Sequence, residues 1–318
     1  MNYAVIGTGA IGGFYGALLQ HAGFDVHFLL HSDFEQVRTQ GLKVESVHKG
    51  DLSLFPVNAY SRVQDMPYCD VIIVSLKTYH NHLLKDMLPK LCRQESIVLL
   101  LQNGLGMEAE VQDLLPENTV LGGMCFICSN KVGPGHIKHL DYGSLSLGEY
   151  AGDTSAAGIT RNLEKVVSEF QEAGIEVQSS DNLMKSRWTK LIWNMPFNGL
   201  STVLRATTEE IMSENNAREL ATWIMQEVKN AAAYCGISIQ DKVVDKLLDV
   251  TSKMVSYHPS MKLDWEKSSP LETQYIYWNP INKASNAGYK MIACRTLAQE
   301  LEFLNRQIVS PGSGTRQG

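Results

Sequence analysis

The feature that most constrains the fold is a glycine cluster near the start of the chain. A short apolar run, NYAVI at residues 2–6, leads into Gly7-Thr8-Gly9-Ala10-Ile11-Gly12 and then into a helical pattern over residues 10–22. In such a strand–turn–helix unit, Gly7 allows the tight turn, Gly9 lets a pyrophosphate approach the backbone, and Gly12 lets helix and strand pack closely. The helix N-terminus adds N–H groups and partial positive charge. The pattern therefore predicts a dinucleotide-binding turn made of Gly7, Thr8, Gly9, Ala10, Ile11 and Gly12.

The rest of the first half alternates between apolar runs and helical patterns. The runs lie at residues 25–30, 71–76, 96–102 and 119–127, and each is too short for a helix. Runs of this kind are typical of buried parallel strands in a doubly wound α/β sheet. Residues 135–149 alternate more strictly between polar and apolar, which predicts antiparallel strands at an edge of the sheet.

After about residue 180 the pattern becomes helical. Helical spacing recurs over 182–213, 217–235, 239–256, 270–288 and 290–308. We therefore expect an α/β fold in which residues 1–180 form a Rossmann-type dinucleotide-binding domain. Residues 181–309 then form an all-helical substrate and catalytic domain, and 310–318 a flexible tail.

Charge and cysteine content limit the partners. The chain has 28 basic and 34 acidic side chains, a net charge of −6, and no long run of either sign. This argues against nucleic acid or an anionic membrane as the main partner, and no apolar stretch is long enough to predict a transmembrane helix.

The six cysteines favour reduced thiols and a cytoplasmic location, and no metal site is expected. The apolar helices of the second half suit either internal burial or a homodimer face.

The end of the second predicted strand bears on the choice of dinucleotide. There, a carboxylate accepts hydrogen bonds from a ribose 2′-hydroxyl and repels a 2′-phosphate. The segment ends in Leu30-His31-Ser32-Asp33. His31 and Ser32 can donate to a phosphate, with Arg38 within reach, whereas Asp33 favours NAD. The balance leans slightly towards NADP.

A second candidate site lies in the helical half. Lys190, Asn194 and Asn198 follow one another at intervals of four in the segment TKLIWNMPFNGL. This spacing places them on one helical face, with a drift of about 40° per step. A lysine and two amides among apolar neighbours suit a small ligand with a carbonyl or carboxylate. The alternative is a solvated lysine with two asparagines that cap or turn the chain near Pro196.

Several motifs in a fixed order resemble the ketopantoate reductase family (2-dehydropantoate 2-reductases) along nearly the whole chain. They are GTGAIGG, Ser75-Leu76-Lys77, Gln102-Asn103-Gly104-Leu105-Gly106, Gly133-Pro134-Gly135, Lys-x3-Asn-x3-Asn, and the Ser-Met-x2-Asp-x7-Glu series from Ser260 to Glu272. The resemblance implies a Rossmann domain joined to a helical domain, with the active site in the cleft between them. It also implies NADPH-dependent reduction of 2-dehydropantoate to pantoate, a step towards pantothenate and coenzyme A.

The resemblance also assigns roles to residues. Lys190 matches the family's proton-donating lysine and Glu272 its glutamate beside nicotinamide and substrate. Asn194, Asn198 and Ser260 match substrate-binding residues, Lys77 and Asn103 match residues that line the cofactor, and Ser129 falls near a position whose backbone contacts it.

The chain departs from the family pattern at three places. Ser-Ser-Pro-Leu precedes Glu272 where an Arg and a Thr are frequent, Asn279-Pro280 replaces Asn-Gly, and His31 replaces an arginine that binds the 2′-phosphate. Two alternatives follow: a reductase of another branched 2-oxo acid, or a non-catalytic NADP-binding sensor. A pure binder has no need for Lys190, Glu272 and Ser260 together, which speaks against the sensor.

Overall fold

A computed structural model describes residues 1–254, 256 and 258–309, so the predicted tail at 310–318 lies outside the described residues. The chain divides into two compact units. The first unit contains residues 1–103 and 107–186, and the second contains residues 104–106 together with the chain from residue 187 onwards. Helix α6 (Leu183–Val203) begins in the first unit and continues in the second.

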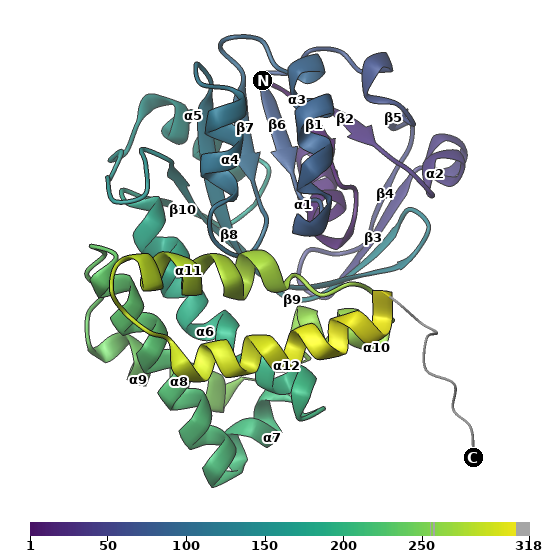
Figure 1. Cartoon of the computed structure of the whole chain (residues 1–318). Helices are drawn as coiled ribbons and strands as arrows, with labels where there is room; N and C mark the ends of the chain where they lie inside the picture. The colour runs from purple at the N-terminus through teal and green to yellow at the C-terminus, as the bar shows by residue number, and fades with distance from the viewer. Residues whose placement is uncertain (255, 257, 310–318) are drawn as a thin grey trace. The chain divides into compact units, whose positions relative to one another are not determined.

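The first unit holds the sheet and the helices that cover it (Figure 1). Its elements are β1 (Asn2–Ile6), α1 (Ala10–His21), β2 (Asp25–Leu29), α2 (Phe34–Gln40), β3 (Leu42–Ser46), β4 (Leu52–Leu54), β5 (Asn58–Tyr60), η1 (Val63–Asp65), β6 (Val71–Val74), η2 (Thr78–Leu83), α3 (Leu84–Leu91), β7 (Ile97–Leu100), α4 (Met107–Leu114), β8 (Thr119–Gly133), β9 (His136–Glu149), α5 (Arg161–Glu172) and β10 (Val177–Ser180).

The strand order confirms the predicted α/β fold class. Strands β5, β2, β1, β6, β7 and β8 lie side by side in that order and pair in parallel, with β1 inside the sheet. This is the doubly wound order, in which ligands bind at the carboxyl ends of the strands near the point where the winding reverses. Strands β6 and β7 are buried along their whole length, as expected for parallel strands covered on both faces.

The alternating segment pairs antiparallel with β8, as predicted, but it pairs parallel with β3 and β10, and the expectation that it lies at an edge is wrong. Strand β9 pairs antiparallel with β8, and on its other side it pairs with β3 along residues 136–139 and with β10 along residues 145–148. Because β9 is 14 residues long, one strand can accommodate both neighbours. The long β8–β9 hairpin thus lies inside the sheet.

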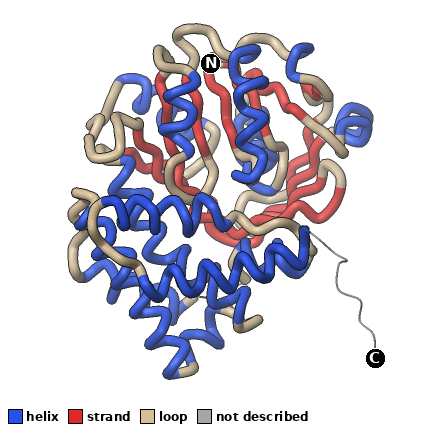
Figure 2. The backbone as a smooth tube through the Cα atoms, in the orientation of Figure 1, coloured by secondary structure: helices blue, strands red, loops and turns tan. Residues whose placement is uncertain are grey.

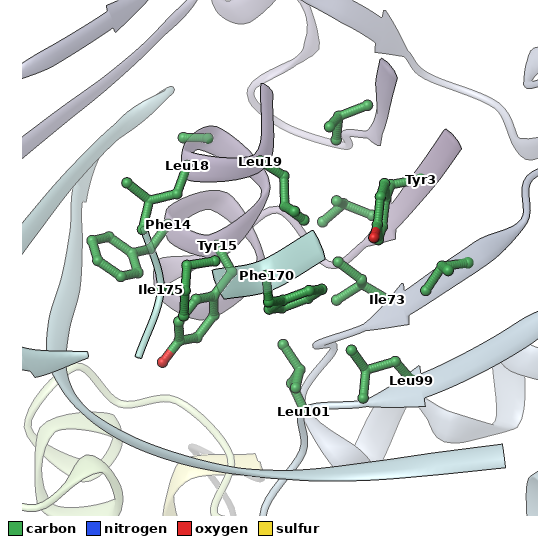
Figure 3. Close-up of a cluster of buried hydrophobic side chains, with 14 of the residues drawn as sticks. Tyr3, Phe14, Tyr15, Leu18, Leu19, Ile73, Leu99, Leu101, Phe170 and Ile175 are labelled. Atoms are coloured by element: carbon green, nitrogen blue, oxygen red, sulfur yellow. The ribbon is translucent and has the colours of Figure 1, made fainter. Parts of the chain in front are cut away.

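The core of the first unit packs helices α1 and α5 against the strands (Figure 3). Phe14, Tyr15, Leu18 and Leu19 of α1 are buried beside Phe170 of α5. Burial of each large apolar side chain stabilises the fold by about 1.5–3 kcal/mol. The same packing fixes the N-terminal end of α1, where the glycine turn lies.

The second unit is helical, as predicted (Figure 2). Its further elements are α7 (Thr208–Ser213), α8 (Asn215–Tyr234), α9 (Lys242–Lys253), α10 (Ser260–Glu266), the π-helical turn η3 (Gln274–Trp278), α11 (Asn279–Asn286) and α12 (Ile292–Val309). Among the helices that the structure describes, none is long and apolar enough to cross a membrane.

Two details of the helical half differ from the prediction. The stretch 182–213 contains two helices, because Arg205 adopts a φ of +58° and Thr207 then starts α7 with a reciprocal capping box to Glu210. Helix α10 has no counterpart in the predicted helical stretches. It begins at Ser260 directly after Pro259 and is only seven residues long, too short to show a helical period.

Candidate active site

The glycine turn between β1 and α1 has no room for side chains at two of its three glycines. Gly7 has a φ of +95°, and a Cβ there would lie 2.5 Å from the backbone nitrogen of Leu76. A Cβ on Gly12 would lie 2.6 Å from the carbonyl oxygen of Gly7. At Gly9 the nearest atom would be 3.9 Å away, so this side of the turn is open and a ligand can approach the backbone.

The start of α1 provides donors for an anion. The first helical hydrogen bond runs from the Gly13 N–H to the Gly9 carbonyl at 2.9 Å, so the N–H groups of Ala10, Ile11 and Gly12 precede the helical ladder. Together with the open side of Gly9, these donors fit a pyrophosphate.

Three hydroxyl groups fasten this turn. Ser75 Oγ donates to the Gly7 carbonyl at 2.8 Å, and Thr8 Oγ1 donates to the Leu29 carbonyl at 3.0 Å. Ser129 Oγ, from β8, donates to the Ala10 carbonyl at 3.3 Å. The structure thus brings Ser129 to the glycine turn across more than a hundred residues of sequence.

Lys77 and Asn103 follow the adjacent parallel strands β6 and β7, and both are partly buried. Gln102 directly precedes Asn103, and its side chain is buried. The sequence did not predict a role for it. Its Nε2 donates to the Leu76 carbonyl at 2.7 Å and to Asn81 Oδ1 at 2.6 Å. Gln102 therefore holds together the two loops that carry Lys77 and Asn103. An amide directly after an apolar run is the sequence signal that could have indicated it.

At the end of β2, His31 and Ser32 are exposed, whereas Asp33 is buried. Asp33 Oδ2 accepts from Lys131 Nζ at 2.6 Å and from the Gly135 N–H at 2.9 Å, and Oδ1 accepts from Ser32 Oγ at 3.0 Å. Desolvation opposes ionisation of Asp33, but these hydrogen bonds and the Lys131 charge together lower its pKa below the ordinary value. Both oxygens of Asp33 thus accept from donors within the protein, and its role towards a ribose stays a prediction.

The neighbouring cation Arg38 is also engaged. It forms an exposed ion pair with Glu35 on the same helix at 2.7 Å.

In the second unit, Lys190, Asn194 and Asn198 lie on the continuous helix α6. Asn194 and Asn198 are 4% and 2% exposed, so both amides are in the interior, while Lys190 is partly exposed. The stripe is flanked by a Trp193–Phe197 stack with ring centroids 5.1 Å apart. A polar stripe with this burial differs from the solvated alternative, in which the amides would cap helix ends at the surface.

Helix α10 meets this stripe at Asn198. The Oδ1 atom of Asn198 accepts from the Met261 N–H at 3.3 Å and from Ser260 Oγ at 3.5 Å. Ser260 and Asn198, which are 62 residues apart, are therefore neighbours. These contacts turn Oδ1 towards α10 and leave the Nδ2 donor on the other side of the amide.

Glu272 is 6% exposed and is separated from the π-helical turn η3 by Thr273 alone. Both of its chain neighbours are bound to α12: the Leu271 N–H donates to Asn305 Oδ1 at 2.9 Å, and the Thr273 hydroxyl donates to Glu302. A buried carboxylate on so firmly held a segment has a fixed position. π-Helical turns occur frequently at functional sites.

The π-turn also binds the loop that follows Asn103. The Leu105 N–H donates to the Tyr275 carbonyl at 2.9 Å, and Asn279 Nδ2 donates to the Leu105 carbonyl at 2.8 Å. Gly104 has a φ of +110°, and a Cβ there would lie 2.5 Å from the Tyr275 carbonyl oxygen. Asn279, one of the departures from the family pattern, thus clamps this loop.

The predicted residues therefore form two groups, each within its own unit. The glycine turn, His31, Ser32, Lys77, Asn103 and Ser129 belong to the first unit, and Lys190, Asn194, Asn198, Ser260 and Glu272 belong to the second. Their assignment to cofactor and substrate stays a prediction.

A glycine turn of this kind on a doubly wound sheet, followed by a helical unit with a buried polar stripe, is typical of the class of two-domain Rossmann-type oxidoreductases. Family models narrow this class. The model described as ketopantoate reductase PanE/ApbA matches residues 3–152, and the model of its C-terminal domain matches residues 182–305. The chain belongs to the ketopantoate reductase family.

Individual relatives agree with this assignment. A 2-dehydropantoate 2-reductase from Nostoc sp. is 49% identical over 304 residues, which cover 96% of this chain and 95% of the relative. The crystal structure of 2-dehydropantoate 2-reductase from Geobacter metallireducens GS-15 superposes with a TM-score of 0.90 at 36% identity, covering 95% of this chain and 99% of that one. D-mandelate dehydrogenase with NADH and anilino(oxo)acetate shares the fold, with a TM-score of 0.86, 23% identity and coverage of 98% of this chain and 100% of that one.

Proposed function

We propose that this protein reduces 2-dehydropantoate to pantoate with NADPH. The observation that carries the proposal is the buried polar stripe of α6, joined by Ser260 and accompanied by the buried Glu272 in the same unit. By their resemblance to the family motif, these residues match its functional positions. The relative from Nostoc sp., named for this reaction, is similar over nearly its whole length.

The residues of the first unit would hold the cofactor. The N–H groups at the start of α1 and the open side of Gly9 suit its pyrophosphate. Lys77 and Asn103, at the carboxyl ends of β6 and β7, are positioned for the nicotinamide half, and Ser129 supports the turn. When bound, the reduced nicotinamide supplies a hydride for the C2 carbonyl carbon of the substrate.

Lys190 is the proposed proton donor. Negative charge develops on the C2 oxygen as the carbonyl is reduced, and the ammonium group of Lys190 stabilises that charge and delivers a proton to the oxygen. A general acid of this kind contributes a rate factor of about 10²–10⁴. The buried surroundings of α6 strengthen such an electrostatic interaction compared with water.

The remaining polar groups orient the substrate. The Nδ2 donor of Asn198 and the hydroxyl of Ser260 suit a substrate carboxylate or hydroxyl, and Asn194 adds a further amide on the same face. Glu272 provides a buried acceptor for a substrate hydroxyl. Orientation by fixed groups accelerates reactions because the reacting atoms must be close and aligned.

Steady-state oxidation of NADPH and of NADH, each with ketopantoate and with a panel of other 2-oxo acids, tests the proposal. We expect the highest kcat/KM with ketopantoate and NADPH. Turnover confined to another 2-oxo acid would keep the mechanism but reject the substrate, and would point to the Ser-Ser-Pro-Leu segment before Glu272. Tight NADPH binding without any turnover would replace the proposal with a non-catalytic sensor.

The proposal includes a cytoplasmic enzyme. All six cysteines are free thiols in the structure, which suits a reducing compartment. A homodimer stays a prediction from the apolar helices of the second unit, and analytical ultracentrifugation would test it.

A further inference from the structure

One face of the β8–β9 hairpin lies over the start of α1. Ser129 and Lys131 are two residues apart on β8, so their side chains emerge on the same face, and Lys131 pairs across the hairpin with Ile137. Ser129 bonds to Ala10 at 3.3 Å. The Ile137 side chain occupies the place that a Cβ on Gly13 would take. The face that carries Lys131 is therefore the face that packs on the phosphate-binding end of α1.

Lys131 reaches the end of β2. Its Nζ is 2.6 Å from Asp33 Oδ2, while Ser32 Oγ is 3.0 Å from the other oxygen of the same carboxylate. One aspartate thus holds an ammonium group and a hydroxyl group side by side. The Lys131 side chain is 35% exposed, so part of it is accessible to a ligand, and an ammonium has three donors, of which Asp33 Oδ2 takes one.

The two ends of this face correspond to two parts of a dinucleotide. In a doubly wound fold the pyrophosphate lies on the N-terminus of the first helix, and the adenosine ribose lies at the end of the second strand. Ser129 is at the first of these places and Lys131 at the second. Because Lys131 compensates the charge of Asp33, a 2′-phosphate there meets a cation rather than an uncompensated carboxylate, and the Ser32 hydroxyl can turn its single proton from Asp33 to the phosphate.

We propose that Lys131, together with Ser32, binds the 2′-phosphate of NADP and sets the preference over NAD. Asp33 is then a positioning residue that holds Lys131 at the end of β2. The choice of NADP as the ligand rests on the function proposed above.

The test is equilibrium binding to the full chain by calorimetry, without any 2-oxo acid. The probes are NADP⁺, NAD⁺ and adenosine 2′,5′-bisphosphate, which carries the 2′-phosphate but no nicotinamide. We expect Lys131→Met to lower the affinity for NADP⁺ and for the bisphosphate by about tenfold or more, which is the usual effect of removing one charged hydrogen bond. The affinity for NAD⁺ should stay within about twofold of the wild-type value. Lys131→Arg, which keeps the charge, should retain most of the affinity for NADP⁺.

Lys138→Met is the matched control. Lys138 lies on the other strand of the same hairpin and is exposed, so its loss removes the same charge from a different place. It should leave all three affinities unchanged.

If Lys131→Met lost affinity equally for NADP⁺ and NAD⁺, Lys131 would have a structural role only. Unchanged affinities would exclude Lys131 from the binding site. If Lys131→Met does not fold, Lys131→Gln supplies the same comparison. Because these measurements need no turnover, failure of the proposed reduction and failure of this inference are distinguishable.

Discussion

The two groups of candidate residues differ in the part of the chain that forms them, which is backbone in the first unit and side chains in the second. In the first unit the candidate site is a glycine turn made of backbone, in which Gly7 and Gly12 lie against neighbouring atoms and Gly9 is open. In the second unit the candidate site is made of side chains on α6, and Asn198 among them is hydrogen-bonded to the distant helix α10. A site made of backbone loses binding when a side chain is added at a glycine. A site made of side chains loses activity when a particular functional group is removed.

The largest expected effect lies in the side-chain site. Lys190→Ala should lower kcat with ketopantoate by about 10²–10⁴, because it removes the proton donor and the charge opposite the developing oxyanion. The dissociation constant of NADPH, measured by fluorescence, should stay within about twofold, since the glycine turn is untouched.

Lys185→Ala is the control for this variant. Lys185 is an exposed lysine in the first turn of the same helix, and its removal should leave kcat unchanged. Retention of full turnover by Lys190→Ala would exclude Lys190 as the acid.

The backbone site predicts opposite outcomes for two glycines of one turn. Gly7→Ala should lower the free energy of unfolding by at least about 2 kcal/mol, because an L-residue is strained at a φ of +95° and its Cβ meets the Leu76 backbone. Gly9→Ala should change the free energy of unfolding by less than about 1 kcal/mol. It should nevertheless lower the affinity for NADPH by about tenfold, because its methyl group fills the open side of the turn.

Urea denaturation and cofactor titration of both variants separate the two effects. If Gly9→Ala bound NADPH with wild-type affinity, the pyrophosphate would not approach this side of the turn.

The smallest expected effect concerns Asn198. Its side chain accepts the hydrogen bonds from α10 and is also proposed to bind the substrate. Asn198→Ala should destabilise the protein by about 1 kcal/mol, because the hydrogen bonds from Ser260 and Met261 lose their acceptor. Asn198→Asp keeps that acceptor, but it loses the Nδ2 donor, repels an anionic substrate and buries a carboxylate, so its Tm should also fall. We expect its KM for ketopantoate to rise about tenfold, measured at a temperature at which the variant is folded by circular dichroism. An unchanged KM in Asn198→Asp would confine Asn198 to a structural role.

Sequence reasoning succeeded where the cause of the structure is local. The glycine turn follows from six consecutive residues, and the polar stripe of α6 follows from intervals of four within one helix. The ion pair of Asp33 could not be predicted, because its partner Lys131 is 98 residues away and nothing in the sequence shows that β8 reaches the end of β2. The edge position of β9 failed for a similar reason, since strand pairing with β3 and β10 is long-range.

The clamp between Asn279 and Leu105 has a consequence for the modularity of the chain. Residues 104–106 belong to the second unit although the chain on both sides belongs to the first. Leu105 is 2% exposed, and both its backbone groups bond to the segment after Glu272. A fragment that starts at residue 187 would therefore lack an interior piece of its own unit. Evolution can exchange the second unit between proteins only together with a three-residue loop that is encoded in the middle of the first.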